Sequence, residues 1–268
     1  MQQIKFEIPK EKLLLMLQEE EKQRFSNEYQ EKCSQVRNEP NGWLRISAEL
    51  QENVAKIFGY EDQISNLLAV DFIRRASQIY KDDERFQTTS VYVRENKTKN
   101  CKYQIGDTIP NINIFNLQNK QLNLHNLLDE TKYNIIICSS NTWQPFRGIT
   151  NIVNTDIYAR LKDKLNLFMI YISEAHATDV WPIGLSAGVL NKKHKTIEDR
   201  NYCAQSMINE HNLDFPVYLD NMHNTLEEEL SCWPFRIVIV KNKKFEYISV
   251  PKNSEYDIIE LYQFLTQI

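Results

Sequence analysis

The residues best suited to chemistry lie in one short run that directly follows an apolar stretch. Leu167–Ile172 has the character of a buried strand, and Ser173-Glu174-Ala175-His176 comes next. The carboxylate of Glu174 and the imidazole of His176 can therefore point into one cleft at a strand end. A carboxylate beside an imidazole orients the ring and stabilises its protonated form, which is typical of a proton relay. On spacing alone, the favoured interpretation is that both are ordinary polar loop residues.

The cysteines follow no recognisable redox or metal-binding pattern. They are few, odd in number and widely spread, and no pair has C-x-x-C spacing. This argues against a zinc knuckle or a dithiol centre and favours reduced, mostly buried thiols. We therefore expect neither a metal ion nor another cofactor. The five cysteines are Cys33, Cys101, Cys138, Cys203 and Cys232.

The composition is typical of a folded, soluble protein. The chain has 268 residues, of which 42% are hydrophobic and 25% charged, and its formal net charge is −4. This balance supplies no polybasic face, which disfavours nucleic acid as a main partner. No apolar run approaches the ~18 residues of a transmembrane helix. Residues 1–21 lack the features of a cleaved secretory or mitochondrial signal, so we expect a soluble intracellular protein of undetermined compartment.

The elements that must position the candidate residues fall into two parts. Residues 1–100 show helical spacing of apolar residues and predict an α-helical N-terminal extension. Residues 101–268 alternate strands and helices and end in a hairpin followed by a helix. This order predicts an α/β domain with a thioredoxin-like mixed sheet flanked by helices and a right-handed crossover. In that fold the reactive residue follows the first crossover strand, at a helix N-terminus.

From about residue 133 to the C-terminus, the chain resembles the iodothyronine deiodinases, selenoenzymes on a thioredoxin scaffold. The most specific stretch is Ile170–Asp179, and further matches follow in order along the chain. They include Trp181, His194, Glu198-Asp199-Arg200, Pro216, Asp220, Met222, Asn224 and Trp233-Pro234-Phe235-Arg236. The resemblance implies removal of iodine from an aromatic ring by a selenolate or thiolate, with Glu and His supplying a proton to the ring carbon. It also implies an aromatic small-molecule ligand.

The resemblance assigns roles to individual positions. The proton-handling positions are Glu174, His176 and His194. The positions that line the pocket are Ser140, Thr142, Tyr171 and Arg236. Pro234 matches the cis-proline that faces the active-site loop in thioredoxin folds, which is an architectural role. His194 could equally be a surface histidine among lysines, and Arg236 could be a structural ion-pair partner.

The nucleophile is where this chain departs from the family. The family has selenocysteine between a Thr and two prolines, whereas this chain has Ser140-Asn141-Thr142-Trp143-Gln144-Pro145-Phe146. The selenocysteine position is therefore Trp143, whose indole has a weak N–H donor and no ionisable group. Cys138 ends the apolar run Tyr133–Cys138, which predicts a strand covered on both faces, so it is not a suitable substitute.

Three interpretations of Trp143 follow, and the sequence leaves all three open. In the first, which we favour, the protein has lost deiodinase chemistry and is an accessory or structural subunit of a larger assembly. In the second, position 143 is truly selenocysteine, and the protein is a thyroxine deiodinase-type oxidoreductase with Glu174 and His176 as its proton relay. In the third, this pair catalyses a different reaction that needs no nucleophile.

The helical extension favours an assembly role. It stands where the family usually has a membrane anchor, and the run Leu13-Leu14-Leu15-Met16-Leu17 would be a natural docking surface for other protein subunits. The same run could equally pack onto the thioredoxin-like core of the chain itself. A mitochondrial respiratory complex is one candidate for the assembly.

Overall fold

The computed structural model describes residues 6–251 and 258–266, and the chain forms two compact units. The helical unit comprises Met1–Asn96 together with His176–Leu190. The α/β unit comprises Lys97–Ala175 and Asn191–Ile268. The sequence predicts a boundary near residue 100 and gives no indication that His176–Leu190 groups with the N-terminal helices. We call His176–Leu190 the insert segment.

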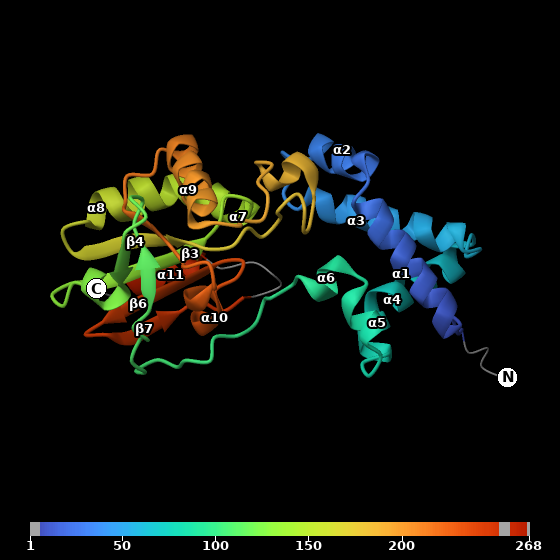
Figure 1. Ribbon diagram of the computed structural model, residues 1–268, viewed down its shortest axis with the longest axis horizontal. Coiled ribbons are helices and arrows are strands. Elements are labelled where there is room, and N and C mark those ends of the chain that lie inside the picture. Colours follow the sequence, from blue (N-terminus) through green and yellow to red (C-terminus); the bar gives the residue numbers. More distant parts are fainter. Residues whose placement is uncertain (1–5, 252–257, 267–268) are drawn as a thin grey trace. The chain divides into compact units, whose positions relative to one another are not determined.

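The helical unit is built from α-helices (Figure 1), and capping side chains fix the starts of some of them. Ser26 accepts a hydrogen bond from the backbone N–H of Tyr29, and Asp62 accepts from the backbone N–H groups of Ile64 and Ser65. The helices are α1 (Lys10–Arg24), α2 (Asn27–Gln35), α3 (Gly42–Ile57), α4 (Gln63–Ile79), α5 (Glu84–Thr88) and α6 (Val91–Arg94). None of the helices in the described part of the chain has the length and apolar character needed to cross a membrane.

The leucine-rich run of α1 lies inside the helical unit. Leu13, Met16 and Leu17 are at most 1% exposed and belong to one apolar core with residues of α2, α3 and α4. Leu15 alone in the run is exposed, at 54%. The predicted docking surface is therefore wrong for this run. The reason is that four of five consecutive apolar residues can share the broad buried face of a helix. The core that the run joins is that of the helical unit, so the alternative of packing onto the thioredoxin-like core is not confirmed.

The insert segment is attached to α2 by hydrogen bonds and close packing. The backbone N–H of Leu185 donates to Ser34 Oγ at 2.8 Å, and Ser186 Oγ donates to the carbonyl oxygen of Cys33 at 2.5 Å. Gly184 has φ +53°, and a Cβ atom there would lie 2.1 Å from the carbonyl oxygen of Gln30. Only glycine therefore allows the segment to approach α2 this closely.

The α/β unit contains a seven-stranded sheet with the order β2-β1-β5-β4-β3-β6-β7. Strands β3, β4 and β5 are parallel, whereas β6 runs antiparallel to β3 and β7 runs antiparallel to β6. The strands are β1 (Asn113–Phe115), β2 (Gln121–Asn123), β3 (Tyr133–Ser139), β4 (Leu165–Tyr171), β5 (Val217–Leu219), β6 (Arg236–Lys241) and β7 (Lys244–Ile248). The helices are α7 (Gln144–Ile152), α8 (Ala159–Leu161), α9 (Ile197–His211), α10 (Thr225–Leu230) and α11 (Ile258–Leu265), with a 3₁₀-helix at Leu124–Leu127 and a π-helix at Val153–Tyr158.

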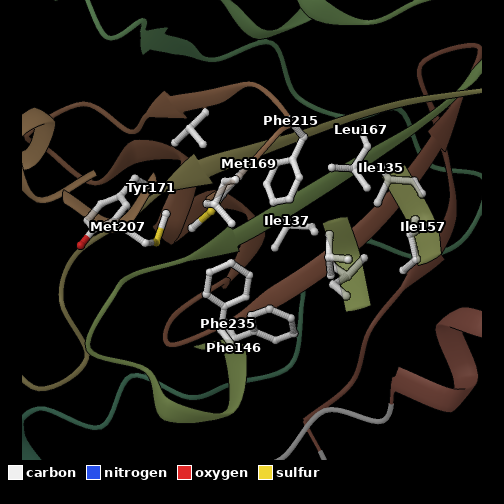
Figure 2. Close-up of a cluster of buried hydrophobic side chains, with 14 of the residues drawn as sticks. Ile135, Ile137, Phe146, Ile157, Leu167, Met169, Tyr171, Met207, Phe215 and Phe235 are labelled. Atoms are coloured by element: carbon white, nitrogen blue, oxygen red, sulfur yellow. The ribbon is translucent and has the colours of Figure 1, made fainter. Parts of the chain in front are cut away.

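Helices cover both faces of this sheet, which explains the continuous apolar run of β3. Ile135 and Ile137 face one cluster with Leu167 and Met169 of β4, to which α7, α9 and α11 also contribute (Figure 2). The alternate residues of β3 face a second cluster, to which α10 contributes. A strand buried on both faces needs apolar residues at every position.

The order and direction of the strands confirm the thioredoxin-like fold. The crossover β3–α7–β4 joins two parallel neighbours, and the β6–β7 hairpin extends the sheet beyond β3. The Trp233–Pro234 peptide bond before β6 is cis, which is the isomer that the sequence predicts for Pro234.

Candidate functional site

The candidate site lies where β3 and β4 end. The two strands are parallel, and their last residues, Ser139 and Tyr171, are paired in register. The chain segments that follow them therefore leave the sheet side by side. One segment brings Thr142 to the start of α7, and the other brings Glu174 to the same edge of the sheet.

Glu174 is the centre of a buried hydrogen-bond network. Its Oε2 accepts from the backbone N–H of Thr142 at 3.2 Å and from the Thr142 hydroxyl at 2.6 Å. Its Oε1 accepts from the Tyr171 hydroxyl at 2.5 Å, from Asn191 Nδ2 at 2.9 Å and from His194 Nε2 at 3.2 Å. The Glu174 side chain is 0% exposed. Because a carboxylate has about four acceptor sites, these donors saturate it.

The network keeps this carboxylate ionised although it is buried. Burial raises the pKa of Glu174, but the hydrogen bonds from His194, Thr142 and Tyr171 lower this pKa by more than burial raises it. The pKa of Glu174 therefore lies below the usual 4.5. Burial and the neighbouring carboxylate raise the pKa of Tyr171 well above its usual value. The phenol therefore stays protonated and can donate to Glu174.

Ser140 joins the same network. Its hydroxyl oxygen accepts from the backbone N–H of Ala175 at 3.2 Å and lies 3.5 Å from the Thr142 hydroxyl. The structure thus gathers Ser140, Thr142, Tyr171 and Glu174 at one place. The roles that the resemblance assigns to them stay predictions.

His194 is a buried member of the site. Its side chain is 2% exposed, which excludes the alternative of a surface histidine among lysines. One ring nitrogen lies against Glu174, and the other, Nδ1, accepts a hydrogen bond from Arg200 Nε at 3.2 Å. Asn191 and Arg200 complete the site, and the sequence alone does not single them out. In the sequence, Arg200 is noticed only as one of the residues that match the family, and no sequence pattern points to Asn191 as a site residue.

His176 has different surroundings from Glu174. It belongs to the helical unit, where its ring centroid lies 5.2 Å from that of Trp43 and 5.1 Å from that of Trp181. The histidine that contacts Glu174 is therefore His194, which is 20 residues away in sequence. The expected relay between Glu174 and His176 stays a prediction.

Trp143 lies between β3 and α7, and its predicted place at the nucleophile position stays a prediction. It is the N-cap residue of α7, with φ −97° and ψ 101°, and its half-buried side chain packs against the core of the α/β unit. The thiols of Cys138, Cys203 and Cys232 are buried. Cys138 is fully buried in β3, and burial raises the pKa of Cys203 to about 12 and that of Cys232 well above its usual range.

Arg236 binds backbone carbonyl groups. Its guanidinium donates to the carbonyl oxygen of Ser231 at 3.0 and 2.7 Å, to that of Lys99 at 2.8 Å, and to that of Ser249. These contacts favour a structural role for this residue, with carbonyl oxygens in place of the expected ion-pair partner. Its predicted place in a substrate pocket stays a prediction.

One group of side chains has the spacing of a metal site. Donor atoms of Glu174, His194 and Cys203 lie within 4.8 Å of one another. His194 Nδ1 accepts a hydrogen bond from the Arg200 guanidinium, and His194 Nε2 is hydrogen-bonded to Glu174. Both ring nitrogens therefore already have partners, one of which is a cation. This arrangement fits a hydrogen-bonded carboxylate better than a bound cation.

Comparison with known proteins decides the family. The model of the iodothyronine deiodinase family matches residues 55–268. The chain belongs to the iodothyronine deiodinase family. The deiodinase match begins within α3, so it extends further toward the N-terminus than the resemblance from residue 133.

Relatives within the deiodinase family are distant. The chain is 25% identical over 197 residues to a type I iodothyronine deiodinase of Xenopus laevis, covering 71% of this chain and 68% of the relative. It is 27% identical over 168 residues to a thyroxine 5-deiodinase of Sparus aurata, covering 61% of this chain and 60% of the relative. Among solved structures, the thioredoxin domain of a thiol-disulfide oxidoreductase from Bacteroides vulgatus matches 60% of this chain and 99% of that domain, with a TM-score of 0.40 and 14% identity.

Proposed function

We propose that this member of the deiodinase family does not break carbon–iodine bonds and serves as an accessory or structural subunit of a larger assembly. The observation that carries the proposal is the indole of Trp143 at the N-terminus of α7. Removal of iodine by the family's chemistry needs an ionised sulfur or selenium at this position, and indole cannot ionise there.

The retained site residues have a structural explanation under this proposal. Glu174 joins the loop after β3, through Thr142, to the chain after β4, through Asn191 and His194. Losing any one donor would leave a buried carboxylate partly unsatisfied, which costs free energy whether or not the protein is an enzyme.

An exposed apolar row on α4 supports the assembly role. Ile64 is 73% exposed, Leu67 is 67% exposed and Leu68 is 37% exposed, and their spacing places all three on one helix face. Contiguous exposed apolar side chains are typical of protein–protein contacts. An apolar helix of another subunit would bury this row. A mitochondrial respiratory complex as the assembly stays a prediction.

An iodide-release assay with thyroxine and a thiol reductant tests the loss of catalysis. The wild-type chain is expected to release no iodide above the protein-free background. The Trp143→Cys variant places a thiol at a helix N-terminus, which lowers thiol pKa values, and we expect release at least about tenfold above background. Trp143→Phe is the control and should stay at background.

The mass of the peptide that contains residue 143, taken from the natural source, decides the second candidate function. That candidate is a reductive dehalogenase with selenocysteine at position 143, and it is favoured by the Ser140–Thr142–Glu174 network beside this position. A tryptophan mass together with no iodide release supports our proposal. A selenium mass, or iodide release by a chain that carries tryptophan, overturns it.

Native size tests the assembly role. In gentle extracts of the natural source, the chain is expected to elute with other proteins in a complex several times its own mass of 31.8 kDa. Elution as a single chain at physiological salt would contradict an accessory role.

A further inference from the structure

We propose that Arg200 holds His194 as a neutral imidazole with its proton on Nε2, so that His194 is a positioning donor to Glu174 and not a source of protons. This inference goes beyond the proposed function, because it holds whichever residue stands at position 143. It concerns a residue, Arg200, that neither the site motif nor the spacing of the sequence singles out.

The tautomer follows from the donors and acceptors around the ring. Arg200 Nε lies 3.2 Å from His194 Nδ1, and a guanidinium N–H can only donate. Nδ1 must therefore carry a lone pair, and the ring proton must be on Nε2. That nitrogen lies 3.2 Å from Oε1 of Glu174, which can only accept when ionised. We assign the tautomer from this geometry.

The guanidinium is fixed in the position that this assignment needs. Arg200 is 2% exposed and lies on α9, the helix that follows the loop carrying His194. Its Nη1 donates to the carbonyl oxygens of Asp220 at 3.0 Å and Asn221 at 2.8 Å, and its Nη2 donates to Asn224 Oδ1 at 2.7 Å. These anchors use the outer N–H groups and leave Nε–H directed at the imidazole. The guanidinium cannot turn away without losing all of them.

Of the other titratable groups near His194, Tyr171 and Cys203 are neutral, whereas Asp199 is ionised because backbone N–H groups lower its pKa. The Tyr171 ring lies 5.9 Å from the imidazole, and the Cys203 thiol lies close by. Burial raises the pKa of both groups, so both stay neutral. The carboxylate of Asp199 is engaged by backbone N–H groups at the start of α9. The charged groups in direct hydrogen-bond contact with the ring are the Glu174 carboxylate and the Arg200 guanidinium, each at a different ring nitrogen.

A second proton on the ring would be unfavourable in this arrangement. It would place an N–H group of an imidazolium against the N–H of Arg200 at 3.2 Å, inside the protein, where like charges repel strongly. Conversely, a neutral imidazole that gave up its Nε2 proton would become an imidazolate. His194 can therefore neither hold a spare proton nor deliver one to Glu174.

Histidine nitrogen NMR on the full-length chain tests the assignment. At pH 6 the wild-type His194 is expected to show a proton on Nε2 and none on Nδ1. In Arg200→Met the repelling N–H is gone while Glu174 remains, so the doubly protonated fraction of His194 should rise at least about tenfold. Arg160→Met, which removes an arginine whose side chain is 73% exposed, is the control and should leave the His194 signals unchanged.

The outcomes are decisive even when Arg200→Met does not fold. The wild-type spectrum alone overturns the proposal if His194 is doubly protonated or carries its proton on Nδ1. Asn224→Ala keeps Arg200 but removes one anchor, and it should raise the doubly protonated fraction by a smaller amount. A folded Arg200→Met or Asn224→Ala variant with wild-type His194 signals would show that Arg200 does not set the tautomer. None of these results depends on iodide release or on the mass at position 143.

Discussion

Replacing Glu174 by glutamine is expected to lower the free energy of unfolding of the α/β unit by about 3–5 kcal/mol. An amide has one acceptor oxygen, whereas the carboxylate accepts from Thr142, Tyr171, Asn191 and His194. The amide NH₂ group would face donors, which leaves buried N–H and O–H groups without acceptors. Denaturant unfolding followed by circular dichroism measures the change.

The effect of Glu174→Gln should also depend on pH. Because the pKa of Glu174 in the folded protein lies below 4.5, its carboxylate stabilises the fold fully above the pKa of the unfolded chain. That contribution is lost as the pH falls through the folded pKa. The stability difference between the wild type and the variant should therefore be constant near neutral pH and shrink below pH 4.5.

The exposed Glu246 on β7 provides the matched control. Glu246→Gln should change stability by no more than about 0.5 kcal/mol, as is usual for surface substitutions. A Glu174→Gln variant that is as stable as this control would show that the network around Glu174 does not support the fold.

Replacing Leu13 by aspartate is expected to unfold the helical unit. Leu13 is 0% exposed, and the change removes a core leucine and buries an unpaired charge. Together these cost at least about 4 kcal/mol, which is most of the stability of a small unit. Hydrogen exchange should then show loss of protection in α1, α3 and α4.

Leu15→Asp is the control for this change, because it makes the same substitution two positions away on the exposed face of α1. It should alter stability by less than about 0.5 kcal/mol. Equal destabilisation by both variants would contradict the internal packing of the leucine run. Stable folding of Leu13→Asp together with loss of native partners would instead restore the predicted docking surface.

The site combines residues expected of the family with a tryptophan at position 143, and the network shows why these can coexist. The hydrogen bonds of Glu174 hold two chain segments together at the end of the sheet, and they do not need a selenol to be favourable. A substitution at position 143 changes a side chain at the start of α7, outside that set of hydrogen bonds. Loss of chemistry at this position would therefore leave the support of the fold in place.

Several features could be predicted from the residues alone because they depend on local pattern. The run Tyr133–Cys138 is apolar at nearly every position, so it had to be a strand covered on both faces. The order of elements around it predicts the thioredoxin-like sheet, and the ordered matches after Ile170 predict the deiodinase family. The run Ser140–Phe146 follows the strand Tyr133–Cys138 directly, which predicts that Trp143 lies at the start of the next helix.

Tertiary structure decided which side chains meet. Sequence spacing favours His176 as the partner of Glu174, but a loop can carry two close residues into different surroundings and bring a residue 20 positions away into contact. Likewise, an apolar run on a helix indicates that one face of the helix must be covered. It does not indicate which other element or protein covers that face. Whether Leu13–Leu17 packs inside the unit depends on where α2, α3 and α4 lie, and only the fold supplies that.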